Sequence, residues 1–156
     1  MKLIITEEQL RLIIENENKV DMNLMKFNSF VDLNPSDWDK MFLHMNNKKG
    51  GKYDGYYIEG DLDFSERESE VTTLDYLVKV GGNLYLTYTK IKSLPRLVEV
   101  GGYLDLEKTQ IKSLPMLSSV GGYLGLVRTP LSKKTSEEEL RKQIKVGGKI
   151  YLNLWN

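Results

Sequence analysis

The tripeptide Val-Gly-Gly occurs four times in the second half of the chain and constrains the fold more than any other feature. Each copy is followed by one variable residue and then by Leu-x-Leu, or by Ile-x-Leu in the last copy. The copies begin at residues 80, 100, 120 and 146, and a divergent earlier copy, EGDLDF, spans 59–64. Self-similarity near 20 residues predicts about five stacked repeats, because one such unit cannot bury its own apolar side.

The interior of a repeat predicts a short strand followed by an irregular return segment. Alternating apolar residues in Leu-x-Leu are typical of a strand with one buried face. The next apolar residues, Ile91, Leu94, Leu97 and Val100, are spaced by three, and Pro95 excludes a regular helix there. We therefore expect an extended or 3₁₀-like return segment. The Gly-Gly pair then supplies a turn with permissive φ.

Threonine occupies one place in three successive repeats, as Thr89, Thr109 and Thr129. A short hydroxyl just after a strand can bond to the backbone of its own turn or of the next repeat. We therefore expect a buried threonine ladder with a structural role.

A helix is predicted before the repeats, in the segment NPSDWDKMFLHM at 34–45. Asn34 or Ser36 can cap it, and Pro35 suits its first turn. Trp38, Met41, Phe42 and Met45 share one side of this helix, which predicts that the stripe packs into a core. The single histidine, His44, lies beside this stripe, and we expect it to pack or to face solvent.

A second helix is predicted in the last repeat, which is six residues longer than the others. Its segment PLSKKTSEEELRKQIK contains two candidate capping boxes, Ser136 with Glu139 and Thr135 with Glu138. We expect a short helix on the outer side of this repeat.

Residues 1–57 do not repeat, so the chain divides into three parts. Residues 58–156 form the repeat array, and 20–57 form a helical N-terminal cap, because an array exposes apolar residues at its ends. Residues 1–19, which begin MKLIITEEQLRLIIE, form a separate short helix with a capping box of Thr6 and Gln9.

Composition excludes several kinds of site. The 156 residues include 22 Lys plus Arg and 22 Asp plus Glu, so the net charge is zero and gives no reason to expect a nucleic-acid partner. There is no cysteine, hence no disulfide and no thiolate metal site. No apolar stretch approaches the length of a membrane helix, and we expect a cytoplasmic protein that uses no cofactor or metal and contacts no membrane.

The variable residues beside the buried leucines carry the candidate site. In a strand they point away from the core, and parallel strands about 4.8 Å apart place them in columns. Tyrosine is frequent there and combines a large contact area with a hydroxyl, which favours protein binding over a merely stacked surface. The candidate binding residues are Asn83, Tyr85, Tyr88, Tyr103, Asp105, Glu107, Lys108, Tyr123, Arg128, Lys149 and Tyr151.

The segment LDLEKTQIKSLPML, at 104–117, resembles the short, twenty-residue variety of bacterial leucine-rich repeat. The resemblance covers about 58–156 and implies an α/β repeat solenoid with a parallel sheet on one face. Thr replaces the usual Asn of the turn, and Gly-Gly stands where the family often has another leucine, so a flatter parallel β-solenoid is the alternative. The start of the chain resembles that of some proteins encoded by tailed bacteriophages.

These patterns predict a non-enzymatic protein-binding module of phage or bacterial origin, with a host defence or regulatory factor as a candidate partner. The alternatives are a structural or cargo protein of a virus particle, delivered by residues 1–17, and a hydrolase that uses Asp61 and Asp63. The edge of the last strand could also pair with a second copy of the chain.

Overall fold

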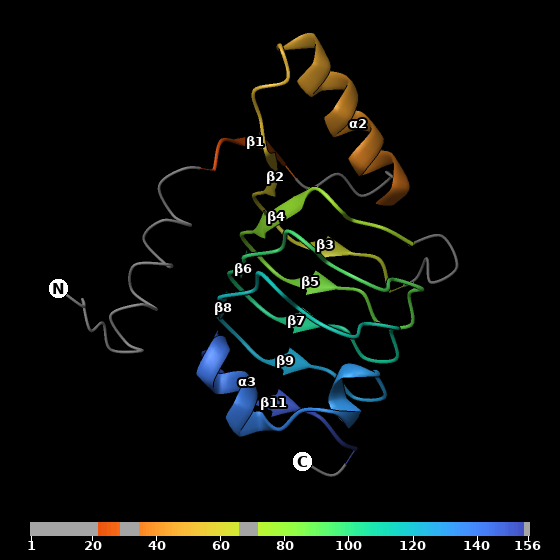
Figure 1. Cartoon of the computed structure of the whole chain (residues 1–156), viewed down its shortest axis with the longest axis vertical. Helices are drawn as coiled ribbons and strands as arrows, with labels where there is room; N and C mark the ends of the chain where they lie inside the picture. Colours follow the sequence, from red (N-terminus) through yellow and green to blue (C-terminus); the bar gives the residue numbers. More distant parts are fainter. Residues whose placement is uncertain (1–21, 29–34, 66–71, 155–156) are drawn as a thin grey trace, which may run out of the picture.

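The computed structural model describes residues 22–28, 35–65 and 72–154 and shows an α/β fold with two parallel sheets and few helices (Figure 1). The predicted N-terminal helix and the acidic segment 66–71 lie outside the described residues. One sheet has six strands: β1 (Leu24–Phe27), β2 (Gly55–Ile58), β4 (Leu77–Val80), β6 (Glu99–Val100), β8 (Ser119–Val120) and β10 (Lys145–Val146). The other has five: β3 (Leu62–Asp63), β5 (Leu84–Tyr85), β7 (Leu104–Asp105), β9 (Leu124–Gly125) and β11 (Ile150–Tyr151).

From β2 onward the chain alternates between the two sheets, and equivalent residues of successive repeats lie side by side. In the five-stranded sheet Leu84 pairs with Leu104, which pairs with Leu124. In the six-stranded sheet Val100 pairs with Val120 in the same way. The strand expected at Leu-x-Leu is therefore present. The six-stranded sheet was not expected. Its strands β4, β6, β8 and β10 each end directly before a Gly-Gly pair. Most of them have only two residues, and the three-residue spacing of apolar residues in the return segment did not indicate a strand.

The Gly-Gly pairs are needed for close approach between repeats and not for unusual backbone angles. A Cβ atom on Gly121 would lie 1.9 Å from the carbonyl oxygen of Gly101, and one on Gly101 would lie 2.2 Å from that of Gly81. Among the described glycines, positive φ occurs only at Gly50 and Gly51. The expectation that these turns depend on permissive φ was therefore wrong. The absence of a side chain is what lets the backbones stack.

The core runs the length of the molecule between the two sheets. Core residues come from every repeat and are almost completely buried. Examples are Leu84, Leu104, Leu124, Val100 and Val120. The threonine ladder is buried too, and the hydroxyls of Thr109 and Thr129 each donate to a leucine carbonyl oxygen in their own turn, at 2.7 Å. The buried hydroxyl of Thr89 has no hydrogen-bond partner in the described part of the chain.

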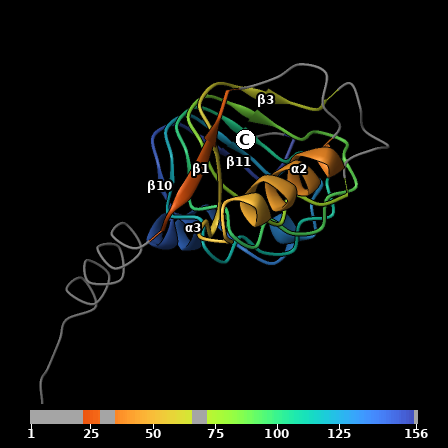
Figure 2. The same cartoon turned by 90° about the horizontal axis from the view of Figure 1, so that it is seen from above.

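Helix α2 (Pro35–Lys48) lies at one end of the stack, near β1 and β2 (Figure 1), and Figure 2 shows it from above. It confirms the helix expected at 34–45. Trp38 and Phe42 are buried against Phe27 and Tyr56, with ring centroids 5.5–6.3 Å apart. The expected cap region therefore contains two strands of the six-stranded sheet besides its helix.

Asp39 fastens α2 to the sheet. Its carboxylate accepts hydrogen bonds from the Tyr56 hydroxyl at 3.0 Å and from the Asp75 N–H at 2.9 Å. Burial raises the pKa of the Asp39 carboxyl, although these hydrogen bonds act in the opposite direction. The pKa of the buried Tyr56 hydroxyl is also raised, first by burial and then by the charge of Asp39.

The last repeat contains a 3₁₀ turn, η1 (Leu131–Lys133), and helix α3 (Glu137–Gln143). Of the two candidate capping boxes, the structure forms the one of Ser136 and Glu139. Leu140 and Ile144 are buried, so this short helix covers the stack with one apolar side. None of the described helices is both long and apolar enough to cross a membrane.

Candidate functional site

The outward side of the five-stranded sheet carries most of the candidate residues. Leu84, Leu104 and Leu124 point into the core, so the residues next to them in sequence face outward. The sheet register places Tyr85 beside Asp105, and Asp105 beside Gly125. The structure therefore brings the predicted columns together on one surface, which we call the tyrosine face, made of Tyr85, Tyr103, Asp105, Tyr123 and Tyr151.

Three tyrosine rings form a continuous cluster across β7, β9 and β11. Tyr103 and Tyr123 are stacked, with centroids 4.5 Å apart and planes 17° apart. Tyr151 meets Tyr123 edge to face at 5.7 Å. Tyr103 is 43 % exposed, although its ring is large and apolar. The cluster can contact a partner through apolar ring surface and through hydroxyl groups.

Gly125 makes room for this cluster, which the sequence pattern did not reveal. A Cβ atom on Gly125 would lie 3.0 Å from Asp105 Oδ1 and 3.6 Å from Cε2 of Tyr123. Gly125 is itself buried, because neighbouring side chains cover it. A larger residue there would displace either the Tyr123 ring or the Asp105 carboxylate.

Asp105 lies at the centre of the tyrosine face. Its Oδ1 accepts a hydrogen bond from the Glu107 N–H at 3.0 Å, and its Oδ2 accepts one from the Tyr123 hydroxyl at 3.5 Å. Burial, followed by the charge of Asp105, raises the pKa of Tyr123 to about 12. The pKa of Tyr85 is raised as well, by burial and then by the neighbouring carboxylates. The hydroxyls of Tyr85 and Tyr123 therefore remain neutral hydrogen-bond donors near pH 7.

Asn83 has a backbone role that the sequence did not indicate. Its Oδ1 accepts a hydrogen bond from the Tyr103 N–H at 2.7 Å, just as Asp61 Oδ1 accepts one from the Asn83 N–H at 2.7 Å. These side chains connect one repeat to the next.

The column of Tyr88, Lys108 and Arg128, which we call the turn column, borders the tyrosine face and has an unusual backbone. The φ angles of these residues are 65°, 58° and 60°. Each is the third residue of a four-residue turn. In the middle repeat this turn is closed by the hydrogen bond from Thr109 N to Leu106 O, at 3.1 Å. Glycine or asparagine is preferred at such a position, so this turn could not be predicted from the residues that form it.

Side chains of the turn column contact one another. The Lys108 ammonium lies 3.9 Å from the centroid of the Tyr88 ring and also bonds to the Tyr88 hydroxyl. Arg128 and Lys149 are exposed, and Glu107 is half-buried. The predicted residues thus form one tyrosine cluster with charged residues on its margins.

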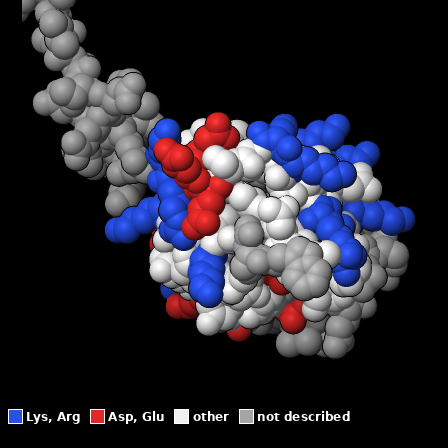
Figure 3. Space-filling model, turned by 90° about the horizontal axis from the view of Figure 1, so that it is seen from below, with Lys and Arg blue, Asp and Glu red and all other residues white. Residues whose placement is uncertain are grey.

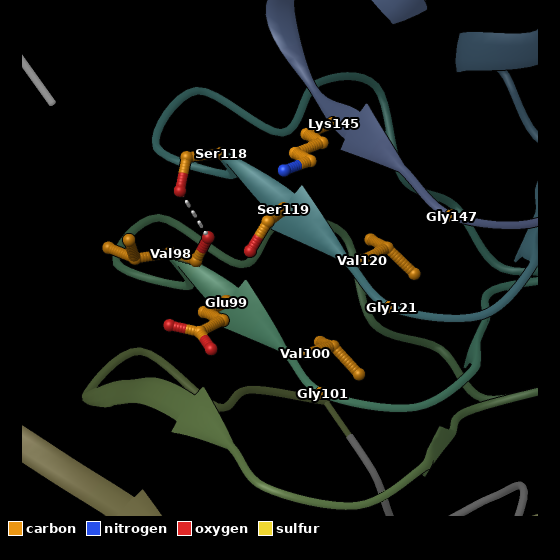
Figure 4. A pocket seen from close by; sticks show the side chains of 10 residues that line it. All are labelled: Val98, Glu99, Val100, Gly101, Ser118, Ser119, Val120, Gly121, Lys145 and Gly147. Atoms are coloured by element: carbon orange, nitrogen blue, oxygen red, sulfur yellow. Dashed lines mark hydrogen bonds between the residues drawn. The ribbon is translucent and has the colours of Figure 1, made fainter. Parts of the chain in front are cut away.

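The six-stranded sheet has a separate shallow hollow of about 540 Å³ (Figure 4). Glu99, Ser119 and Lys145 reach it from three neighbouring strands, and Glu99 also pairs with Lys79 at 3.3 Å. Ser118 lies at its margin and donates to the Val98 carbonyl oxygen at 3.1 Å. None of the binding residues predicted from the sequence lines this hollow.

Asp61 and Asp63, the carboxylates considered for hydrolysis, both accept hydrogen bonds from neighbouring residues. Asp61 Oδ1 binds the Asn83 N–H, and Asp63 Oδ1 accepts from both the N–H and the hydroxyl of Ser65, at 2.9 and 2.6 Å. Among the described residues there is no group of three acidic, histidine or cysteine side chains that could hold a metal ion.

Comparison of the chain with protein-family models, with curated proteins and with solved structures found no match. The case for a function therefore rests on the geometry of the site.

Proposed function

We propose that residues 58–156 form a repeat solenoid similar to a leucine-rich repeat array, capped at one end by α2 and β1. The side-by-side register of Leu84, Leu104 and Leu124 supports this architecture. The second parallel sheet is a feature that the flatter β-solenoid alternative also has. In either arrangement the repeats present one regular outward surface, which is the property that matters for binding.

We further propose that the protein is a non-enzymatic binding module whose protein partner docks on the tyrosine face. The stacked pair of the exposed Tyr103 and the half-buried Tyr123 carries this proposal. Exposed tyrosines contribute large contact area at a low cost in side-chain entropy, and they are enriched where protein partners bind most tightly. Asp105 at the centre of the face and Glu107 and Lys149 at its margins would set the orientation of the partner through charge.

A phage origin, a bacterial cytoplasmic location and a host defence or regulatory factor as the partner belong to the same proposal. They rest on the resemblance of residues 1–15 to the start of phage-encoded proteins. Delivery to a virus particle by residues 1–17 is the alternative. Deleting that segment and measuring incorporation into particles separates the two.

The binding proposal is tested with a double variant, Tyr103→Ala with Tyr123→Ala. Partners are first captured from the native host and identified by mass spectrometry, and the leading candidate is then purified and titrated against the protein. We expect the double variant to lose binding at least 100-fold, since two central aromatic residues contribute about 2 kcal/mol or more each.

A matched control is Tyr57→Ala, which removes a half-buried tyrosine from the opposite sheet. We expect this variant to bind the partner as the unchanged protein does. Undiminished binding by the double variant, with its melting temperature preserved, would contradict the proposed site.

A further inference from the structure

The charges of this neutral chain are strongly segregated. Three segments that return from the five-stranded sheet, 86–98, 108–119 and 126–136, contain eight Lys or Arg residues and no Asp or Glu. Most of these cations are exposed. We define the basic face by seven of them: Lys90, Lys92, Lys108, Lys112, Arg128, Lys133 and Lys134.

The return segments are stacked, so the cations of successive repeats form rows. Gln110 N donates to Ile91 O at 3.1 Å, and Leu131 N donates to Ile111 O at 3.0 Å. This register places the backbone of Lys92 beside that of Lys112, and neighbouring hydrogen-bonded segments are about 4.8 Å apart. Figure 3 shows the result from the C-terminal end of the stack: Lys and Arg gather at the upper right without acidic residues among them, whereas both signs mix at the left.

The backbone of the turn column indicates that two of these cations are retained at a cost. Lys108 and Arg128 have φ angles of 58° and 60°, where glycine is unstrained and a side chain is not. Strain of this kind tends to persist at functional sites. Arg96 is different, because its guanidinium stacks on Tyr76 at 4.7 Å and donates to the Asp54 carbonyl oxygen at 2.6 Å. We therefore leave Arg96 out of the basic face.

We propose that the basic face binds the phosphate backbone of a nucleic acid. Lysine and arginine side chains that neutralise phosphates release condensed counterions, so a row of cations can bind a nucleic acid without an apolar surface. The exposed hydroxyls of Ser93 and Ser113 and the amide of Gln110 lie among the cations and can donate to phosphate oxygens.

An acidic protein fits the basic face less well. A protein interface has an apolar centre from which charged residues are depleted. Among the described residues, the exposed large apolar side chains are Leu43, Tyr88, Tyr103 and Leu154, and only Tyr88 borders the basic face. A zero net charge does not reveal this arrangement, because the three return segments themselves contain no acidic residue and Glu107, which precedes Lys108, is half-buried. The inference does not depend on the tyrosine face.

The test measures binding of the full chain to a fluorescein-labelled 20-nucleotide oligothymidylate and to a 20-base-pair duplex, by anisotropy, from 25 to 200 mM salt. The variant replaces Lys92, Lys112 and Lys133 by Gln, and the control replaces Lys40, Lys48 and Lys142 by Gln. Both triple variants change the net charge equally. Polyglutamate and vesicles containing phosphatidylserine are the competing polyanions.

We expect saturable binding that weakens with salt, and a loss of at least tenfold in the basic-face variant. The slope of log affinity against log salt should fall by about 2 on single strands, since each neutralised phosphate contributes about 0.7. The control should retain the affinity of the unchanged protein. The proposal is overturned by absence of binding at 25 mM salt, by an equal loss in the control, or by tighter binding to polyglutamate or vesicles than to DNA.

Discussion

Arg141 donates a hydrogen bond from Nη2 to the carbonyl oxygen of Gly148, at 2.9 Å. Its Nη1 donates to the carbonyl oxygen of Val146 at 3.1 Å. In each earlier repeat the equivalent oxygens accept from the Gly-Gly N–H groups of the next repeat, as Val120 O accepts from Gly147 N at 2.9 Å. The guanidinium group thus takes the place of two backbone donors and covers the open edge of the last repeat.

Replacing Arg141 by Ala should therefore uncover this edge. We expect the free energy of unfolding to fall by about 1 kcal/mol, because a charged donor to two carbonyl groups is lost. We also expect the mass measured by light scattering to rise with concentration, since open carbonyl groups at a strand edge can pair with a second copy. Lys142→Ala is the control, because Lys142 forms an i,i+4 ion pair on α3 with Glu138, as Arg141 does with Glu137. A monomeric Arg141→Ala protein of unchanged stability would show that the edge needs no cover.

The close stacking of glycines predicts a large effect of a single methyl group. Gly121→Ala should lower the free energy of unfolding by about 3 kcal/mol, because the new Cβ meets the Gly101 carbonyl oxygen and the backbones must separate. Gly50→Ala is the comparison: its φ is 82° but no atom lies within 4 Å of its Cβ position, so it should lose only about 1 kcal/mol. Urea denaturation measures both. Equal losses would mean that φ, and not space, selects these glycines.

The turn column predicts a stabilising substitution. Lys108→Gly should raise the free energy of unfolding by about 1 kcal/mol, because glycine accepts the positive φ without steric cost. Glu107→Gly, one residue earlier in the same turn, lacks this benefit and should destabilise the protein. Thermal denaturation followed by circular dichroism compares them. If Lys108→Gly is destabilising, contacts of the lysine side chain with Tyr88 outweigh the strain.

The three threonines form an internal control for one another. Thr109→Val and Thr129→Val should each cost about 1 kcal/mol, because a buried hydrogen bond to a leucine carbonyl oxygen is lost. Thr89→Val should be neutral or stabilising, because its buried hydroxyl has no partner in the described structure. The three free energies of unfolding are compared in one buffer. A cost at Thr89 equal to that at Thr109 would contradict the difference between the repeats.

Asp39 predicts a pH dependence of stability. Burial raises the pKa of its carboxyl above the ordinary value of 3.8, so the folded protein holds this proton more tightly than the unfolded chain does. The stability that this group contributes is complete below pH 3.8 and is lost as the pH rises through the raised pKa. The melting temperature of the unchanged protein, relative to that of Asp39→Asn, should therefore fall as the pH rises from 3.5 to 7. A constant difference between the two proteins would show that Asp39 titrates normally.

Periodicity alone was sufficient to predict much of the fold. The spacing of Val-Gly-Gly gave the equivalence of Leu84, Leu104 and Leu124, and the sheet register repeats it. The box of Ser136 and Glu139 marked the start of α3. Such patterns are local, since they depend on which side of an element is buried and on which backbone groups need a cap.

Other features depended on contacts between repeats, which one repeat does not display. The second sheet appears only where two-residue strands such as Glu99–Val100 and Ser119–Val120 lie together. The left-handed turns carry Tyr88, Lys108 and Arg128 in place of the glycine that usually identifies them.

The sequence by itself determined the repeat unit, the buried side of its main strand and the set of outward residues, because alternation and period fix these locally. Only the tertiary structure decided which of these outward residues contact one another, which bond to the backbone and which form a charged surface. Because the repeats are stacked, the ring of Tyr103 lies against that of Tyr123, and the side chain of Asn83 accepts a hydrogen bond from the backbone of the next repeat. Stacking also aligned Lys92 with Lys112 through the bonded return segments, which produced a basic surface on a chain whose charges sum to zero.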